Sequence, residues 1–443
     1  MSAIIESHFH SPCLSQVQIG GGGYARVFLH KLETQIQVVA RLVLPVNDKI
    51  KTEAEVATMD SLRARTSIPV PKVHLFCSTA NNPVHAEWIL MDYLPGRPFC
   101  QTWATLTWEQ KKTTAQDIAK VMAETFSLTA TACGSMIEDC SLHDDQRALR
   151  YIADSGVAPQ SFYRTVTSET PSGAFVLGPV NDVVFLDADI GLVPPSSRGP
   201  FATEREYMEA MAFRGIPGTR SQGRSEQWAY ERALELYDVV RPFYRDLDDA
   251  PDTFAPAPLF HFAHNDFSAH NILIDPSTGH VTGVLDWEMS GFCPSWVAAS
   301  PAAWFNDDNR RFILKGRQTA PEGFGDEPAE AAEVREYFRS ELCRLDPSLF
   351  ANYWRGVEPR AIYYNVSEPF PGNVIGWMNE YERYGWDSQR VPFPFDFEGW
   401  LRDLDALRTY VFHAITRYPF RSTPDIVRRK MPLPPQPEHH HAA

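Results

Sequence analysis

The fold is decided by the stretch His264-Asn265-Asp266-Phe267-Ser268-Ala269-His270-Asn271-Ile272-Leu273-Ile274-Asp275 and by the later segment Val284-Leu285-Asp286-Trp287-Glu288. In the first stretch a histidine, an aspartate two residues later and an asparagine seven residues later precede a short apolar run. A second apolar run ends at Asp286. Short apolar runs bounded by turn residues favour strands. Polar side chains that can bind a metal or move protons therefore gather at the mouth of two predicted strands.

The residues between the two apolar runs predict a β-hairpin. The sequence Asp275-Pro276-Ser277-Thr278-Gly279 consists of residue types that favour turns. Antiparallel pairing of residues 272–274 with residues 280–285 would bring Asn271 and Asp286 to the same end of the hairpin. We therefore expect these two side chains to be neighbours although they are far apart in the sequence.

The polar side chains of this stretch are the types that phosphoryl transfer requires. An attacking hydroxyl needs a carboxylate that orients it and accepts its proton, and Asp266 can supply that group. Mg²⁺ prefers hard oxygen ligands, which Asn271 and Asp286 offer. We expect His264 to support the loop through hydrogen bonds rather than to titrate. A lone His-x-Asp is best explained by chance, but the complete set in this order is harder to explain that way.

Composition limits the kinds of protein that this chain can be. A length of 443 residues with 44% hydrophobic and 12% aromatic residues predicts a folded protein with two lobes or domains. The 56 acidic residues outnumber the 41 basic ones, for a net charge of −15. This balance disfavours binding to nucleic acids or to anionic membranes.

Cysteine usage and hydropathy predict where the protein works. The seven cysteines are scattered and include no CxxC pair. This pattern predicts neither a zinc site nor a disulfide framework. The N-terminus lacks the pattern of a signal peptide, and no apolar run approaches the ~20 residues of a spanning helix. We therefore expect a cytoplasmic protein. We also expect either a monomer or a weak dimer.

Near the N-terminus, residues 16–29 predict a strand, a glycine loop and a second strand. The loop is Gly20-Gly21-Gly22-Gly23. Glycines allow close approach of the backbone to a ligand, with N–H groups available to phosphate oxygens. Taken alone, the run is better explained as the tip of a flexible hairpin.

The β-branched run 35–44 predicts a strand with Arg41 at its middle. A buried cation there needs an anion or a carboxylate as partner, whereas on an edge strand it would face solvent. Residues 49–65 have helical spacing of apolar residues and carry Glu55.

Two further strands, at residues 73–77 and 87–94, lead to the breaker cluster Pro95-Gly96-Arg97-Pro98, which suits a hinge. Residues 15–94 therefore predict a small, mainly β lobe with one helix, preceded by an N-terminal extension at residues 1–14. Mainly helical patterns favour a second, larger lobe over residues 95–430. A flexible, proline-rich tail is expected at residues 431–443.

The motifs together resemble the aminoglycoside phosphotransferase / choline kinase-like family of the protein-kinase-like superfamily, in particular its fungal branch. The resemblance rests on HNDFSAHNILID followed by GVLDWE and on supporting matches spread over residues 15–300. The supporting matches are Glu53-Ala54-Glu55-Val56-Ala57-Thr58-Met59, Ile68-Pro69-Val70-Pro71-Lys72-Val73, Ile89-Leu90-Met91-Asp92-Tyr93-Leu94-Pro95-Gly96 and Arg198-Gly199-Pro200-Phe201.

The resemblance implies an α+β, bilobal protein-kinase-like fold that binds ATP between its lobes. The glycine loop would cover the phosphates, and Arg41 would take the place of the phosphate-pairing lysine, with Glu55 as its helix partner. The segment Met91, Asp92, Tyr93 and Leu94 would be the adenine-binding hinge. Arg41 departs from the usual lysine, and arginine is bulkier and forked, so the exchange is not conservative.

The implied function is an ATP- and Mg²⁺-dependent phosphotransferase that acts on a hydroxyl of a small molecule. In this reading Asp266 is the catalytic base and Asn271 and Asp286 are the metal ligands. The large lobe would recognise the acceptor. Its aromatic side chains, such as Trp287, Trp296, Trp304 and Trp354, could line a pocket but more commonly pack in a core. Acidic residues such as Glu288, Asp307 and Asp308 could attract a cationic acceptor or form a solvated face.

Two other functions compete with this prediction. A kinase-like protein that binds nucleotide with weak or no catalysis would fit Arg41 and the irregular glycine loop. A non-haem iron oxygenase could use His264, Asp266 and a distant histidine, His280 or His413, as its ligands. The oxygenase would leave Asn271 and Asp286 unexplained.

Overall fold

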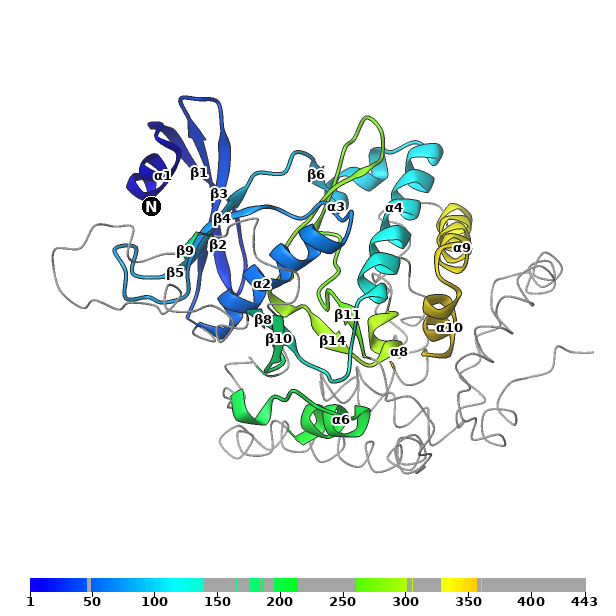
Figure 1. Cartoon of the computed structure of the whole chain (residues 1–443). Helices are drawn as coiled ribbons and strands as arrows, with labels where there is room; N and C mark the ends of the chain where they lie inside the picture. The colour runs from blue at the N-terminus through cyan, green and yellow to red at the C-terminus, as the bar shows by residue number, and fades with distance from the viewer. Residues whose placement is uncertain are drawn as a thin grey trace, which may run out of the picture.

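The computed structural model has a strand-rich N-terminal part joined to a helix-rich part (Figure 1). This arrangement confirms the predicted α+β, two-lobed fold. Where the structure is described, it covers residues 1–45, 49–138, 164–165, 175–182, 185, 195–213, 260–300, 305, 328–356 and 360. The predicted tail at residues 431–443 and His413, Trp304, Asp307 and Asp308 lie outside these ranges.

The N-terminal part is built on an antiparallel sheet with the strand order β1-β2-β3-β5-β4-β9. Alternate residues of a strand face opposite sides. In β3, Val39 therefore packs towards α2, and Val38 and Ala40 pack on the other face. Its strands are β1 (Cys13–Gly21), β2 (Ala25–Leu32), β3 (Gln37–Val43), β4 (Val73–Cys77), β5 (Glu87–Asp92) and β9 (Arg164–Thr165).

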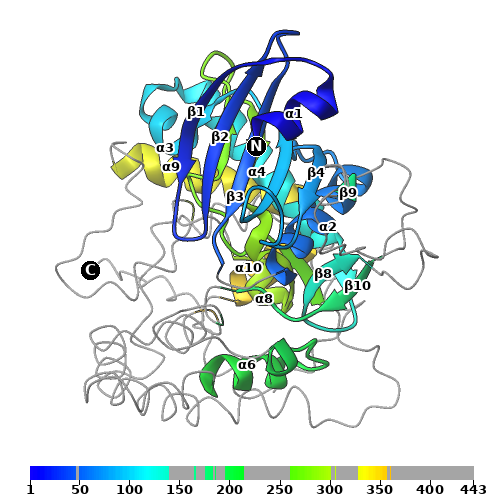
Figure 2. The same cartoon turned by 90° about the vertical axis from the view of Figure 1, so that its left-hand side faces the viewer.

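Helices cover the two faces of this sheet. The predicted helix is α2 (Ile50–Arg65), which contributes Val56, Met59 and Leu62 to the core between the sheet and the second lobe. The N-terminal extension forms a helix that the sequence pattern did not reveal, α1 (Ser2–Phe9), whose Ile4 and Ile5 pack on the opposite face. Figures 1 and 2 show α1 outside the sheet, on the side away from α2.

The breaker cluster after β5 connects the sheet to the second lobe. Its strand β6 (Arg97–Pro98) pairs antiparallel with β12 (Ile272–Ile274), which itself pairs with β13 (Val281–Val284). Gly96 has a φ of 132°, a value that side chains rarely adopt. The chain leaving the small lobe is therefore fixed directly onto the predicted hairpin.

The second lobe is centred on the long helix α4 (Trp108–Ser127). Thr107 and Gln110 form a capping box at its start, each accepting a hydrogen bond from the other's backbone N–H. The buried face of α4 packs against α9 (Pro328–Leu345), whose Phe338 and Leu342 are fully buried. The other helices in the described ranges are α3 (Phe99–Thr102), α6 (Glu204–Phe213), α8 (Ser295–Ala298), α10 (Pro347–Arg355) and the 3₁₀ helices η1 (Trp103–Thr105), η4 (Pro195–Ser197) and η6 (Trp287–Met289).

Short strands link the second lobe to the first. The strand β8 (Ser135–Glu138) pairs with β10 (Phe175–Gly178) and packs against α2. The strand β11 (Phe260–Ala263), directly before the histidine of the opening stretch, pairs with β7 (Thr129–Ala130) and with β14 (Gly291–Cys293). Within the described part of the chain, no helix is both long and apolar enough to cross a membrane.

Candidate active site

The hairpin places Asn271 beside Asp286, as its turn chemistry predicted. In the hairpin, Ile272 pairs with Val284, and the N–H of Leu285 donates to the carbonyl of Asn271 over 2.8 Å. The Asp275 carboxylate accepts from the N–H of Ser277 over 2.8 Å and closes the turn. The register of the two strands therefore brings the predicted metal ligands to the open end of the hairpin.

His264 joins the loop before the hairpin to the segment after it. Its Nε2 donates to the carbonyl of Leu285 over 2.8 Å, and its Nδ1 accepts from the N–H of Asp266 over 3.3 Å. These roles require the neutral ring, and burial lowers the pKa of His264. The ring also lies 4.4 Å from that of Trp287. The contacts are those of a residue that supports the loop.

Asp266 lies at the solvent-open mouth of the site. Partial desolvation, together with the negative charge of Asp286, raises the pKa of Asp266 to about 6, although a hydrogen bond from Asn271 opposes the shift. A carboxylate with a pKa near 6 can accept a proton more readily than an ordinary aspartate and still be ionised at neutral pH. Its properties therefore suit a general base.

Asn271 is oriented by Asp266. The amide nitrogen of Asn271 donates to both the carbonyl oxygen and Oδ2 of Asp266, each over 2.9 Å. This orientation leaves the Asn271 amide oxygen as the atom that can ligate a metal. Asp286 is half-buried nearby. One amide oxygen and one carboxylate fit the hard-oxygen preference of Mg²⁺.

Two residues flanking the site have left-handed backbone conformations. Asn265 has a φ of 59° and Asp286 a φ of 64°. The Asn265 side chain donates to the carbonyl of Met289 over 3.0 Å, which holds the loop against η6. Such conformations are rare outside glycine and cluster where a side chain must be aimed for function. Here they set the backbone direction at Asn265, next to Asp266, and at Asp286.

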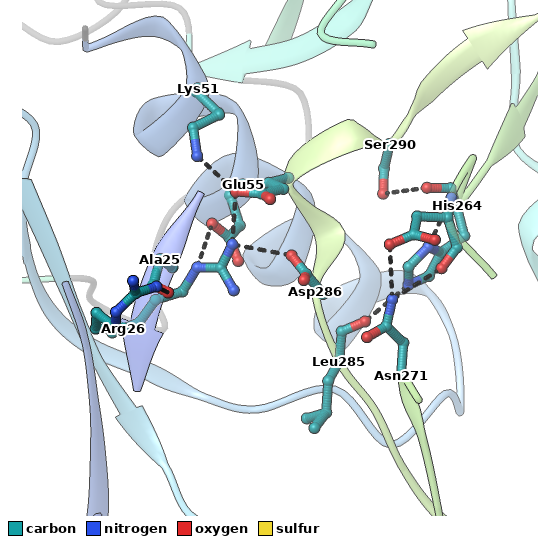
Figure 3. A network of polar contacts seen from close by, with 12 residues as sticks. Ala25, Arg26, Lys51, Glu55, His264, Asn271, Leu285, Asp286 and Ser290 are labelled. Atoms are coloured by element: carbon teal, nitrogen blue, oxygen red, sulfur yellow. Dashed lines mark hydrogen bonds and ion pairs between the residues drawn. The ribbon is translucent and has the colours of Figure 1, made fainter. Parts of the chain in front are cut away.

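Arg41 lies at the centre of a buried ion-pair network. Figure 3 labels Lys51, Glu55 and Asp286 of this network. Its Nη2 is 2.9 Å from Asp286 Oδ1 and 2.5 Å from Glu288 Oε2, and its Nε is 3.3 Å from Glu55 Oε2. Burial alone would lower the pKa of Arg41, but the three carboxylates outweigh it and raise the pKa. The strand cation thus faces carboxylates of the helix and of the hairpin end, and does not face solvent.

Glu55 occupies the helix position opposite Arg41. Burial, with the negative charges of Glu288 and Asp286, raises the pKa of Glu55 to about 7, against the opposing effect of Arg41 and Lys51. Burial dominates because the Glu55 side chain is 2% exposed. The pKa of Glu55 therefore lies above that of an ordinary glutamate, even with Arg41 as its partner.

Sequence reasoning missed two members of this network, the cation Lys51 and the role of Glu288. Glu288 is buried and its Oε2 is 2.6 Å from the Nζ of Lys51, so it neither belongs to a solvated face nor points at an acceptor. The signal for Lys51 was its place one helical turn before Glu55. Trp287 and Trp296 are also buried and belong to the core.

The glycine loop forms an open turn between β1 and β2. Gly20 and Gly21 end β1, and the N–H of Gly22 donates to the carbonyl of Ala25 over 3.0 Å. A Cβ added at Gly22 or Gly23 would meet nothing within 4 Å. None of the four glycines has a positive φ. The backbone conformation therefore does not require glycine here, and the open space at Gly22 and Gly23 is compatible with close approach of a ligand.

The segment Met91 to Leu94 leaves the sheet beside the hairpin. Met91 is buried, and the Asp92 carboxylate is 2.7 Å from Nε2 of His74, which lowers the pKa of Asp92. Tyr93 packs at the rim of the core. A Cβ at Gly283 would lie 3.0 Å from Leu94 Cδ1, so Leu94 contacts the β13 strand. This segment therefore reaches the hairpin that carries Asn271 and Asp286.

With His280 as the distant histidine, the ligand set of a non-haem iron oxygenase is not assembled. His280 lies at the far end of the hairpin from His264, and its Nδ1 is 2.9 Å from the Asp117 carboxylate on α4. Among the described residues, no group of three or more His, Cys, Asp or Glu side chains is placed to hold a metal. The remaining candidate, His413, lies outside those residues.

Two fungal proteins are similar in sequence to this chain. A fungal relative, a subtelomeric hrmA-associated cluster protein of Aspergillus fumigatus, is 25% identical over 356 residues, covering 75% of this chain and 69% of the relative. A clavilactone A biosynthesis cluster protein of Ampulloclitocybe clavipes is 25% identical over 285 residues, 62% of this chain and 60% of the relative.

Solved structures and a family sequence model also match. A thermostable mutant of aminoglycoside phosphotransferase APH(4)-Ia, in complex with AMP-PNP and hygromycin B, aligns with 14% identity and a TM-score of 0.45 over 86% of this chain and 94% of its own. The sequence model of the phosphotransferase enzyme family matches residues 15–297, more than half of the chain and nearly all of the span that carries the predicted motifs. The chain therefore belongs to the phosphotransferase enzyme family, with the protein-kinase-like fold that its motifs predicted.

Proposed function

We propose that this protein is an ATP- and Mg²⁺-dependent phosphotransferase that transfers the γ-phosphate to a hydroxyl of a small molecule. One observation carries the proposal. Asp266, with a raised pKa, lies in hydrogen-bond contact with Asn271, and Asn271 lies beside Asp286 at the same hairpin end. A proton acceptor and two hard-oxygen ligands therefore lie at one end of the hairpin, and these are the groups that phosphoryl transfer requires.

The proposed reaction assigns one task to each side chain. Asp266 orients the acceptor hydroxyl and takes its proton as the hydroxyl oxygen forms a bond to the γ-phosphorus. The bond between that phosphorus and the oxygen bridging to the β-phosphate breaks, so ADP leaves with the bonding electrons. Asn271 and Asp286 would hold Mg²⁺, which offsets charge on the β- and γ-phosphates. His264 keeps the loop in place through Leu285.

The small lobe would hold the nucleotide in this proposal. The open turn at Gly20, Gly21, Gly22 and Gly23 offers backbone N–H groups to the phosphates. The segment Met91 to Leu94 would contact the adenine. Arg41 would exchange part of its contact with Asp286 for the phosphates, because an arginine fork can serve several oxygens at once.

The test is a coupled assay for ADP with a panel of alcohols, supplied with Mg·ATP and analysed by mass spectrometry for phosphorylated product. Two relatives are named for gene clusters, one of them biosynthetic, so hydroxylated metabolites head the panel. We expect acceptor-dependent ADP in equal amount to the phosphorylated alcohol. Iron-dependent oxygen consumption without ADP would contradict the proposal.

A second candidate function is nucleotide binding with weak or no catalysis. The observation in its favour is the 2.9 Å contact between Arg41 and Asp286, because it occupies a proposed metal ligand. Thermal-shift titration with Mg·ATP distinguishes the two functions. A shift without turnover on any acceptor would favour the binding protein, and a shift with turnover favours the enzyme.

A further inference from the structure

Lys51 lies where three segments of the site meet. It belongs to the first turn of α2, and its side chain is fully buried. Its Nζ is 2.6 Å from Glu288 Oε2 and 5.1 Å from the centre of the Tyr24 ring. Tyr24 directly follows the four glycines, and Glu288 lies two residues after Asp286. One ammonium group therefore contacts both the flank of the glycine turn and the proposed metal-binding segment.

Glu288 connects Lys51 to Arg41, because both cations contact it. The same oxygen of Glu288 lies 2.6 Å from Lys51 and 2.5 Å from Arg41. Around it, the two cations face three carboxylates, because Glu55 and Asp286 also contact Arg41. A buried ion pair holds only when geometry and partners compensate desolvation, so the removal of one cation leaves buried negative charge uncompensated.

The small lobe anchors the backbone around Lys51. The N–H of Lys49 donates to Glu87 Oε1 over 2.6 Å, and the hydroxyl of Thr52 donates to the other Glu87 oxygen. Glu87 lies on β5, so the start of α2 is tied to the sheet. The backbone that carries Lys51 is therefore anchored to the sheet through Glu87.

We propose that Lys51 is a positioning residue of the phosphate site. It holds Glu288 and Tyr24 so that the Asp286 segment and the glycine turn stay aligned while Arg41 moves from carboxylates to nucleotide phosphates. The inference rests on the proposed function. Without Lys51, Arg41 is the cation left, among the described residues, to neutralise the three carboxylates. It is then less available to phosphates, and the site repels them more strongly.

The test compares two ligands that differ in their phosphates. Isothermal titration measures the dissociation constants of Mg·AMP-PNP and of adenosine for the wild type, Lys51→Met and Lys51→Arg. We expect Lys51→Met to weaken Mg·AMP-PNP binding by roughly tenfold or more, with adenosine affinity unchanged. Lys51→Arg should restore Mg·AMP-PNP affinity, because arginine keeps the charge next to Glu288.

Lys111 provides a matched control. It is buried, its Nζ is 2.9 Å from Glu330, and it lies 5.4 Å from the centre of the Trp103 ring. Like Lys51, it is a buried lysine near the start of a helix with a carboxylate and an aromatic ring as neighbours, but it lies on α4, which packs against α9. Lys111→Met should leave both dissociation constants at their wild-type values even if it lowers the melting temperature.

Each outcome decides the inference. Equal losses for Mg·AMP-PNP and adenosine in Lys51→Met, or no loss in either, would make Lys51 a purely structural residue and overturn the proposal. If Lys51→Met does not fold, Lys51→Gln replaces it in the same titrations. Glutamine removes the positive charge but can still donate a hydrogen bond to Glu288. A wild type that binds no Mg·AMP-PNP would overturn the proposed function itself and the inference with it.

Discussion

Arg41 Nη2 lies 2.9 Å from Asp286 Oδ1, so the strand of the small lobe is tied directly to the proposed metal-binding end of the hairpin. The pair joins residues 245 positions apart in sequence. The contact connects the two lobes at the place where nucleotide would bind. The site therefore depends on the relative position of the lobes as well as on the loop that carries Asp266.

Replacement of Arg41 tests this dependence. Arg41→Met leaves Glu55, Asp286 and Glu288 close together with one cation fewer, and such losses in buried networks typically cost about 3–5 kcal/mol. We expect a lower free energy of unfolding by that order in urea denaturation at pH 8. A stability equal to that of the wild type would show that the network is not formed in solution.

The raised pKa of Glu55 predicts how stability changes with pH. The folded-state pKa, about 7, lies above the unfolded value near 4.5, so the folded protein binds more protons between those values. Stability from this group is complete below pH 4.5 and is lost as pH rises through about 7. The glutamine in Glu55→Gln does not titrate, so the variant does not show this loss of stability.

The measurement is the melting temperature of the wild type and of Glu55→Gln across pH 4.5 to 8. We expect the melting temperature of the variant relative to the wild type to rise over this range. A constant difference would mean that Glu55 stays ionised throughout.

The pKa of Asp266 predicts the pH dependence of turnover. A general base works when ionised, and the pKa of Asp266 is raised to about 6. We expect kcat/KM for the acceptor to rise as pH increases through about 6 and to level off above it. If kcat/KM instead falls as pH rises through 6, Asp266 is not the proton acceptor.

The covering helix α1 is expected to stabilise the small lobe. Ile5 is fully buried against the sheet, and truncation of such a side chain costs about 2–5 kcal/mol. Ile5→Ala should therefore lower the free energy of unfolding by that order. Ile36→Ala is the control, because Ile36 is 41% exposed. Equal effects of the two substitutions would mean that α1 does not pack on the sheet.

Local sequence patterns predicted much of the structure. The turn at residues 275–279 specified the hairpin, and the hairpin register alone brought Asn271 next to Asp286. A charged residue inside a β-branched strand indicated that a buried Arg41 needs an anion or a carboxylate as partner, and the structure places Glu55 beside it. These features depend on neighbouring residues or on one turn, so the sequence contains enough information to predict them.

Features that depend on distant partners could not be predicted in this way. Lys51 and Glu288 are 237 positions apart, and nothing near either residue reveals the other. The short helix α1 is stabilised by the sheet it covers, since isolated helices of that length are marginal. The strand β9 joins the edge of the sheet beside β4 from a distant part of the chain, and its pairing is likewise long-range.

The measurement that tests the central claim most directly is phosphoryl transfer by Asp266→Asn under single-turnover conditions, with the affinity for Mg·AMP-PNP measured in parallel. The control is Asp275→Asn, an exposed turn residue of the same hairpin. The account predicts a rate lower by about 10²–10⁴-fold for Asp266→Asn, nucleotide affinity unchanged, and a wild-type rate for the control. Near-normal transfer by Asp266→Asn on the true acceptor would contradict it.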